Sequence, residues 1–165
     1  MWFSLSHMFR KRQTMMYPEE KPDLGPEFRG RPVLVAENGK ERCVACGLCA
    51  RACPPFAISM QAGPDEDERK ERGPEVFEID MLRCIFCGYC EEVCPEEAIV
   101  MSPYYDFNFQ ARENAKFGKD KLVKDKAELQ GRLDFLQARR NANYGDVYNF
   151  EESNNIHTYR NRDSQ

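Results

Sequence analysis

The sequence predicts an α+β fold assembled from a duplicated module. Two matching runs, at residues 43–54 and 84–95, hold all eight cysteines of the 165-residue chain. Residues 42–60 aligned with residues 83–101 at a constant offset give ten identities in nineteen positions, which indicates an internal repeat. Apolar segments with strand-like alternation flank the runs. The predicted order of elements is therefore strand, cysteine loop, helix and strand, and this unit occurs twice along the chain.

Composition and charge limit the classes of protein to consider. The chain is 41% hydrophobic with a mean hydropathy of −0.73, which is typical of a soluble chain with one domain or one domain and long extensions. No apolar run reaches the ~20 residues that a membrane-spanning helix needs. The formal net charge of −4 argues against nucleic-acid binding. Eight clustered thiols indicate a reducing compartment.

The spacing within each cysteine run is the most specific signal. Each run reads C-x2-C-x2-C-x3-C-P, the pattern of bacterial iron–sulfur proteins in which the fourth cysteine binds the other cluster. Gly47 and Gly88 permit positive φ angles close to an inorganic core. The fourth cysteine of each run is expected on a turn of helix that the following proline, Pro54 or Pro95, cannot continue. We therefore predict two 4Fe-4S clusters. The predicted ligands are Cys43, Cys46, Cys49 and Cys94 for cluster 1, and Cys84, Cys87, Cys90 and Cys53 for cluster 2.

Two other interpretations of the cysteines were weighed. Disulfides suit a secreted chain, but no signal peptide with a clear apolar region precedes the runs. Zinc sites usually use paired C-x2-C units separated by a longer finger, whereas here four cysteines fall within eleven residues and the pattern then repeats. Iron–sulfur clusters fit the spacing better than either alternative.

The N-terminal part is predicted to lie outside the repeat. In residues 1–16, Trp2, Leu5, Phe9 and Met16 share one helical stripe, and the basic residues 10–12 follow, so an amphipathic helix could contact either a membrane surface or a partner protein. Residues 17–32 contain four prolines and two glycines and are expected to form an extended arm. His7 is assigned no role.

The strands are predicted from short apolar segments. Residues 33–36 followed by Asn38-Gly39 predict a strand and a tight turn. Residues 76–79 alternate before the second run, and residues 56–60 and 98–101 follow the first and second runs. Paired antiparallel strands under two short helices give a two-cluster, ferredoxin-like fold with pseudo-twofold symmetry. The clusters cross-link the chain and so stabilise this fold.

The remaining segments carry weaker signals. Residues 61–74 are charged and predict a solvated loop, with a docking surface as the alternative. The aromatic residues 104–109 either shield a cluster or pack on a neighbour, and residues 119–140 are compatible with a helix despite Gly131. Residues 141–165 are polar and expected to be disordered or ordered only against a partner. His157, within this tail, is assigned no role.

Over residues 14–110 the chain resembles the eight-iron, ferredoxin-like subunit I of respiratory NADH:quinone oxidoreductase, complex I. Besides the cysteine runs, the matching stretches are Met16-Tyr17-Pro18-Glu19-Glu20, Phe28-Arg29-Gly30-Arg31, Glu41-Arg42-Cys43-Val44-Ala45-Cys46 and Arg83-Cys84-Ile85-Phe86-Cys87-Gly88. The short N-terminal segment, Pro54-Pro55 and the C-terminal tail depart from the family pattern.

The resemblance implies an electron-transfer subunit of a translocating oxidoreductase. It would pass electrons from the NADH-oxidising module to the terminal cluster of a neighbouring subunit and then to quinone. It would lie peripherally on the cytoplasmic side of the bacterial inner membrane, with the other peripheral-arm subunits and the membrane-arm junction as partners. A free ferredoxin carrier, and the equivalent subunit of a membrane-bound hydrogenase or related reductase, are the alternatives.

The predicted division of the chain follows from these segments. An amphipathic helix (1–16) and an extended proline-rich arm (17–32) precede a two-cluster domain (33–110) and a partner-binding C-terminal extension (111–165). No catalytic residue is predicted. Ile58, Ile85, Phe86 and Ile99 are candidates for the apolar shell of the clusters, while Arg42 and Arg83 either raise the potentials or are ordinary surface charges.

Overall fold

The computed structural model describes residues 2–10, 14–64 and 72–141 of the chain. Three features predicted from the sequence lie outside these residues in whole or in part. They are the basic cluster at residues 11–12, the centre of the charged loop at residues 65–71, and the tail from residue 142 onward with His157. The side chain of Trp2 is likewise not described.

The first sheet is built around strand β1. This strand pairs antiparallel with β2 and β5 and parallel with β7. Asn38 and Gly39 have φ angles of 55° and 79° and connect β1 to β2, as the Asn-Gly pair predicts for a tight hairpin. The strands of this sheet are β1 (Pro32–Glu37), β2 (Lys40–Glu41), β5 (Ile99–Met101) and β7 (Val123–Asp125).

The second sheet is entirely antiparallel, with the order β3-β4-β6. Its strands are β3 (Ile58–Gly63), β4 (Gly73–Asp80) and β6 (Lys116–Phe117). The register between β3 and β4 shifts between Gln61 and Ala62, so one irregularity bends this pair. The strands predicted at residues 33–36, 56–60, 76–79 and 98–101 all correspond to strands of the two sheets.

Two short helices follow the cysteine loops. Helix α2 (Leu48–Ala52) begins after Gly47, and helix α3 (Tyr89–Glu92) begins after Gly88. The two glycines have φ angles of 79° and 82°, which confirms the predicted left-handed conformation. Both helices end before the Cys-Pro pair, where proline could not supply the next backbone N–H. The prediction that Cys53 and Cys94 lie on a turn of helix is therefore wrong, since both follow the helices.

The C-terminal segment differs from the single helix predicted for residues 119–140. It forms α4 (Lys119–Leu122), β7, a 3-10 turn η2 (Lys126–Leu129) and then α5 (Gln130–Asn141), after an earlier 3-10 turn η1 (Arg112–Ala115). The continuous-helix prediction is wrong because residues 123–125 pair with β1 as a strand. Strands β6 and β7 both lie beyond residue 110, where the sequence predicted the two-cluster domain to end.

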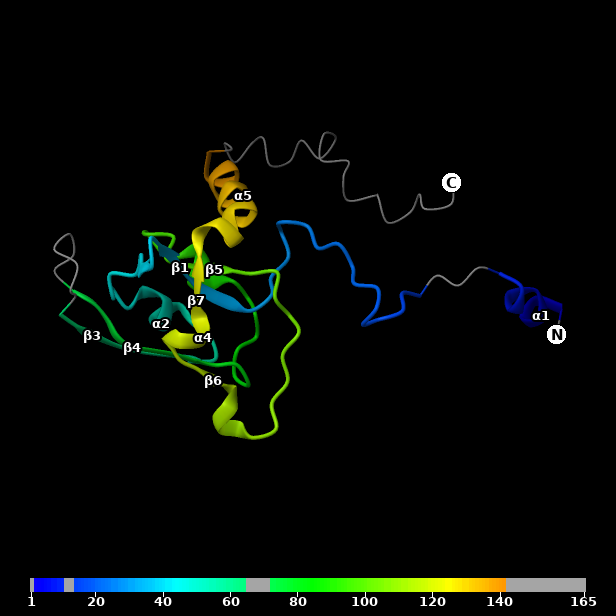
Figure 1. Cartoon of the computed structure of the whole chain (residues 1–165), viewed down its shortest axis with the longest axis horizontal. Helices are drawn as coiled ribbons and strands as arrows, with labels where there is room; N and C mark the ends of the chain where they lie inside the picture. Colours follow the sequence, from blue (N-terminus) through cyan, green and yellow to red (C-terminus); the bar gives the residue numbers. More distant parts are fainter. Residues whose placement is uncertain (1, 11–13, 65–71, 142–165) are drawn as a thin grey trace.

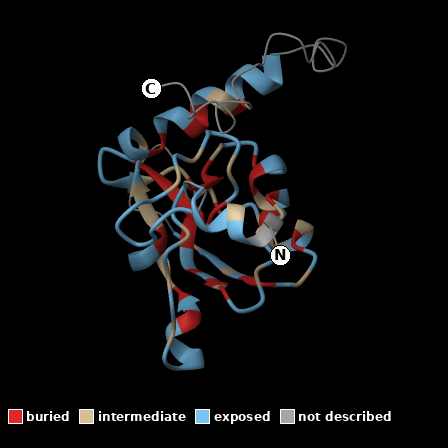
Figure 2. Ribbon diagram, turned by 90° about the vertical axis from the view of Figure 1, so that its right-hand side faces the viewer, coloured by how far each residue is buried: buried red, intermediate tan, exposed pale blue. Residues whose placement is uncertain are grey.

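Strand β1 lies between two apolar cores. Leu34 packs with Ile99 in the core that contains the cysteines, while Val33 and Val35 pack with the α5 side chains Leu133 and Leu136. Successive side chains of a strand point to opposite faces, so one strand serves both cores. Figure 2 shows the buried residues concentrated along the central strands and on the inner side of the flanking helices. Helix α5 therefore covers the face of the sheet that is turned away from the cysteines.

The N-terminal arm leads from the sheets to a separate helix. Figure 1 shows α1 (Trp2–Met8) at the far end of the arm, away from the two sheets. The helix is shorter than the predicted range of residues 1–16, and Leu5 and Phe9 are 50% and 83% exposed. Between Tyr17 and Arg31 the chain forms no helix or strand, in agreement with its proline content. Among the described residues, no helix is long and apolar enough to cross a bilayer.

Candidate metal centres

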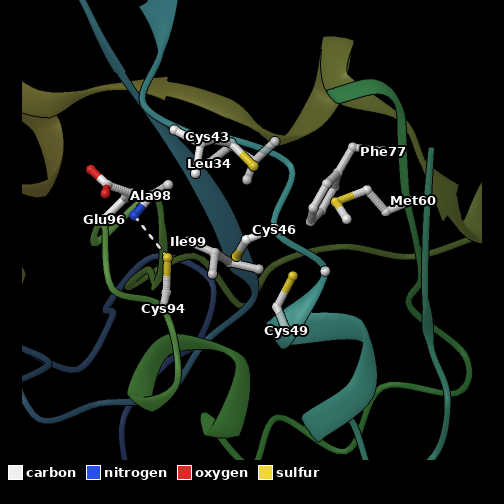
Figure 3. Close-up of a pocket in the computed structure, with 12 residues that line it drawn as sticks. Leu34, Cys43, Cys46, Cys49, Met60, Phe77, Cys94, Glu96, Ala98 and Ile99 are labelled. Carbon is white, nitrogen blue, oxygen red and sulfur yellow. Dashed lines mark hydrogen bonds between the residues drawn. The ribbon is translucent and has the colours of Figure 1, made fainter. Parts of the chain in front are cut away.

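Three cysteines of the first run and one cysteine of the second run surround a cavity next to β1. Cys43 and Cys46 lie on the loop after β2, Cys49 lies on α2, and Cys94 follows α3. Figure 3 shows their side chains directed toward a common space, with Phe77 and Met60 on one side. The cavity has about 350 Å³ of empty space, part of it open to solvent, and Leu34 and Ile99 complete its apolar wall.

A second cavity of about 350 Å³ is lined by the other four cysteines. Cys84 and Cys87 come from the loop after β4, Cys90 comes from α3, and Cys53 comes from the end of α2. Ile58, Ile79 and Phe86 supply much of the apolar lining. Each cavity therefore combines three cysteines of one run with the fourth cysteine of the other.

Backbone N–H groups approach the cysteine sulfurs. Ala57 N and Ala98 N donate to Cys53 Sγ and Cys94 Sγ, each at 3.3 Å, and Ala45 N donates to Cys43 Sγ at 3.4 Å. Ala57 and Ala98 occupy equivalent positions in the two modules, four residues after the fourth cysteine. Hydrogen bonds to sulfur stabilise negative charge on it, which is one means by which a protein adjusts the potential of an iron–sulfur centre.

Burial raises the pKa of several cysteine thiols, so these thiols ionise less readily when no metal is bound. It raises the pKa of Cys49 to about 12, with a further contribution from the neighbouring Cys43 and Cys94. Burial likewise raises the pKa of Cys84 and of Cys90, and both are also affected by other cysteines around the second cavity. A metal bound here must therefore displace protons from the sulfurs and compensate for the clustered thiolate charge.

The donor sets fit iron–sulfur clusters. Four thiol sulfurs line each cavity, apolar side chains surround them, and backbone N–H groups face some of the sulfurs. Within residues 2–10, 14–64 and 72–141, no three His, Cys, Asp or Glu side chains are arranged to hold a single metal ion. The eight cysteines are instead divided equally between two larger cavities.

Known proteins are similar to this chain in sequence. A protein-family model described as a 4Fe-4S dicluster domain matches residues 42–124. NADH-quinone oxidoreductase subunit 9 of Rhodothermus marinus is 54% identical over 162 residues, covering 96% of this chain and 70% of the relative. This chain belongs to the NADH-quinone oxidoreductase subunit I family. The family member from Nitrosospira multiformis, subunit I 1, is 52% identical over 126 residues, covering 76% of this chain and 72% of its own length.

A solved structure also resembles the chain. One chain in the structure of the membrane-bound sulfane sulfur reductase, an archaeal respiratory membrane complex, is 30% identical with a TM-score of 0.49. The match covers 68% of this chain and 55% of that one.

Membership of the subunit I family confirms the principal functional predictions. The chain is an electron-transfer subunit of NADH-quinone oxidoreductase, and its cofactors are two 4Fe-4S clusters. The mixed helix and strand content agrees with the predicted ferredoxin-like class.

The residues predicted around the cysteines have mixed outcomes. Ile58 and Ile99 are buried at 9% and 2% exposure, whereas Ile85 is 60% exposed at the rim of the second cavity. The prediction that Ile85 belongs to the dry shell is wrong because its side chain, although it lines the second cavity, is largely exposed to solvent. Arg83 donates to the Phe56 carbonyl at 3.5 Å, and Arg42 lies 4.0 Å from Glu97. Neither contact involves a cysteine.

The aromatic segment at residues 104–109 packs within the protein. Phe107 lies between Phe86 and Phe117, with ring centroids 6.0 Å and 6.3 Å away, and Phe109 lies 5.6 Å from both Phe107 and Phe117. Since Phe86 lines the second cavity, this aromatic group also supports the loop that carries Cys84 and Cys87.

Sequence reasoning missed two contacts to the second cysteine run. Arg29 of the arm donates from Nη1 to the Cys87 carbonyl at 2.7 Å, although it was noted only as part of the Phe28-Arg29-Gly30-Arg31 stretch. Glu91 is 3% exposed and pairs with Arg132 of α5. A glutamate in a polar, four-residue helix gives no signal of burial, and its partner lies 41 residues away.

Proposed function

We propose that this chain relays single electrons from the NADH-oxidising module toward the terminal cluster of a neighbouring subunit, and from there to quinone. The observation that carries the proposal is the pair of four-cysteine cavities in a chain of the subunit I family. A 4Fe-4S cluster, when bound, accepts and returns one electron. The protein residues hold the two centres in fixed positions, so transfer between them requires no diffusion.

Each cluster takes three ligands from one run and the fourth from the other. Cluster 1 is held by Cys43, Cys46, Cys49 and Cys94, and cluster 2 by Cys84, Cys87, Cys90 and Cys53. The cavity linings support this assignment because they divide the cysteines in the same way.

The two halves of the domain are related by a pseudo-twofold axis. Such an operation would exchange β1 with β4, α2 with α3, and β3 with β5. Pairing of β1 with β5 is then equivalent to pairing of β4 with β3, and both pairs are antiparallel. Matching left-handed residues, Ala45 with Phe86 and Gly47 with Gly88, further support a duplicated origin.

The side chains around the clusters exclude water while leaving edges close to the surface. Phe77, Ile79 and Ile99 are at most 2% exposed and wall off the inner sides of the cavities. Cys46 is exposed, and Ile85 marks an exposed rim of the second cavity. These two edges are suited to exchange electrons with neighbouring proteins, because each reaches the protein surface.

The remaining segments attach the domain to its complex. The subunit lies on the cytoplasmic side of the inner membrane and contacts other peripheral-arm subunits and the membrane-arm junction. The exposed apolar residues Leu5, Met8 and Phe9 support a docking role for residues 1–16, and the arm at residues 17–32 connects this region to the domain. The extension from residue 111 onward is assigned to partner binding, in addition to the strands that it contributes.

Low-temperature electron paramagnetic resonance tests the proposed function. The tagged chain is purified with its companions from gently solubilised membranes, and spectra are recorded after NADH and then after dithionite. We expect two 4Fe-4S signals from this subunit to develop with NADH. Signals that develop only with dithionite, in a chain without partners, would contradict the proposal and favour a free carrier. Partners without an NADH response would indicate a complex with a different electron donor.

A further inference from the structure

The buried ion pair between Glu91 and Arg132 lies at a distinctive place in the fold. The two side chains are 3% and 6% exposed, and two hydrogen bonds join them: Arg132 Nε donates to Glu91 Oε1 at 2.9 Å, and Arg132 Nη2 donates to Glu91 Oε2 at 2.5 Å. Glu91 Oε1 also accepts from Met101 N at 2.7 Å, while Arg132 Nη1 donates to the Pro26 carbonyl at 2.6 Å. The pair therefore joins four segments: α3, β5, α5 and the arm.

Glu91 stands between two cysteines that serve different cavities. Cys90, directly before it, lines the second cavity, and Cys94, three residues later, lines the first. A displacement of α3 would therefore move one sulfur of each cavity at the same time. Arg132 approaches α3 from α5, whose leucines pack in the outer core and whose Arg140 donates to the Cys94 carbonyl at 3.5 Å.

The internal repeat shows that a carboxylate is not needed to form a cysteine loop and helix of this kind. The position equivalent to Glu91 in the first module is Ala50, which packs against the cysteine-containing core. A buried ion pair contributes little net stability relative to well-packed apolar residues, because burial removes both charges from water. Its paired, two-pronged geometry instead favours one arrangement of the segments that it joins.

We infer that Glu91 and Arg132 are positioning residues that fix α3 between the two clusters and so set the properties of both at once. This inference rests on the proposed ligand sets. Other charged contacts reach the same run from outside: Arg29 donates to the Cys87 carbonyl at 2.7 Å and Arg140 donates to the Cys94 carbonyl at 3.5 Å. These contacts lie at the exposed edges of the run, whereas the Glu91–Arg132 pair is buried between the two ligating positions.

Three variants of the full-length chain, in the intact complex, test the inference. Arg132→Lys keeps the positive charge but loses the planar fork, and Glu91→Gln keeps the side-chain shape. The double variant Glu91→Ala/Arg132→Leu replaces the pair with apolar groups, as at Ala50. Arg139→Ala is the matched control, because Arg139 lies on the same helix, is 53% exposed and approaches Glu92 only at 3.6 Å.

The measurements are redox titrations followed by low-temperature electron paramagnetic resonance, with thermal unfolding and iron content recorded separately. We expect Arg132→Lys and the double variant to shift the midpoint potentials and line shapes of both clusters together. Glu91→Gln should cause a smaller change in the same direction, and Arg139→Ala should leave the spectra unchanged.

Two results would overturn the positioning role. One is wild-type spectra and potentials in both Arg132→Lys and the double variant, even if their thermal stability falls. The other is a change confined to one cluster. Failure of the proposed function is recognised separately, because the two 4Fe-4S signals of the unaltered complex would then develop with dithionite but not with NADH.

Discussion

Removal of the Arg29 charge should lower the reduction potential of the cluster held by the second cysteine run. The guanidinium donates to the Cys87 carbonyl at 2.7 Å, and its Nε lies 3.3 Å from the point where a Cβ on Gly88 would be. A reduced cluster carries one more negative charge than an oxidised one. A nearby cation therefore stabilises the reduced state and raises the potential, so Arg29→Gln should have the opposite effect.

The size of the shift follows from the position and exposure of this charge. Two unit charges about 7 Å apart interact by about 0.6 to 2.4 kcal/mol at effective dielectric constants of about 80 to 20. The Arg29 side chain is 45% exposed, and Glu92, 3.7 Å away, offsets part of its charge, which favours the lower part of that range. About 1 kcal/mol corresponds to roughly 40 mV for one electron, since 59 mV is a tenfold change in the equilibrium constant.

The assay is a redox titration of the purified complex, monitored by low-temperature electron paramagnetic resonance. Arg29→Lys retains the charge without the two-nitrogen fork and should shift the potential less than Arg29→Gln. Lys126→Gln is the control, since Lys126 is 39% exposed and pairs with Glu37 instead of the cysteine loop. An unchanged or raised potential in Arg29→Gln, with both clusters intact, would refute the electrostatic reasoning.

Four further predictions concern ligands, backbone and packing. Cys53→Ala should remove mainly the cluster 2 signal, and loss confined to cluster 1 would reverse the ligand assignment. Gly88→Ala should lower the iron content, because a side chain at a residue with φ 82° costs about 1–2 kcal/mol. Gly131→Ala should raise the unfolding temperature, because the space around its Cβ position is open and alanine favours a helix over glycine by about 1 kcal/mol. Leu133→Ala should destabilise the protein by about 2–5 kcal/mol, measured by thermal unfolding, and an unchanged midpoint would show that α5 is not firmly packed.

Features that depend on neighbouring residues could be predicted from the sequence. The Asn38-Gly39 turn, the positive φ angles at Gly47 and Gly88, and the strands at residues 33–36, 56–60, 76–79 and 98–101 all follow from short patterns. The cysteine spacing identified the type of cofactor because such spacing is tied to the shape of the cluster.

Features that depend on distant partners could not be predicted. The apolar residues between 119 and 140 have a spacing that fits a helix, but residues 123–125 pair with β1 as a parallel strand. The same limit applies to Arg29 and Arg132, whose contacts lie 58 and 41 residues away along the chain. No local pattern marks an arginine for a contact of that kind.

The parallel pairing of β7 with β1 has a consequence for the order of events during synthesis. Residues 34–36 leave the ribosome early, but their partners at residues 123–125 emerge only after both cysteine runs. Such long-range pairing forms late because a large loop must close first. The cysteines are therefore translated and available to the machinery that delivers iron and sulfide before the C-terminal segment can complete the sheet and close over its outer face.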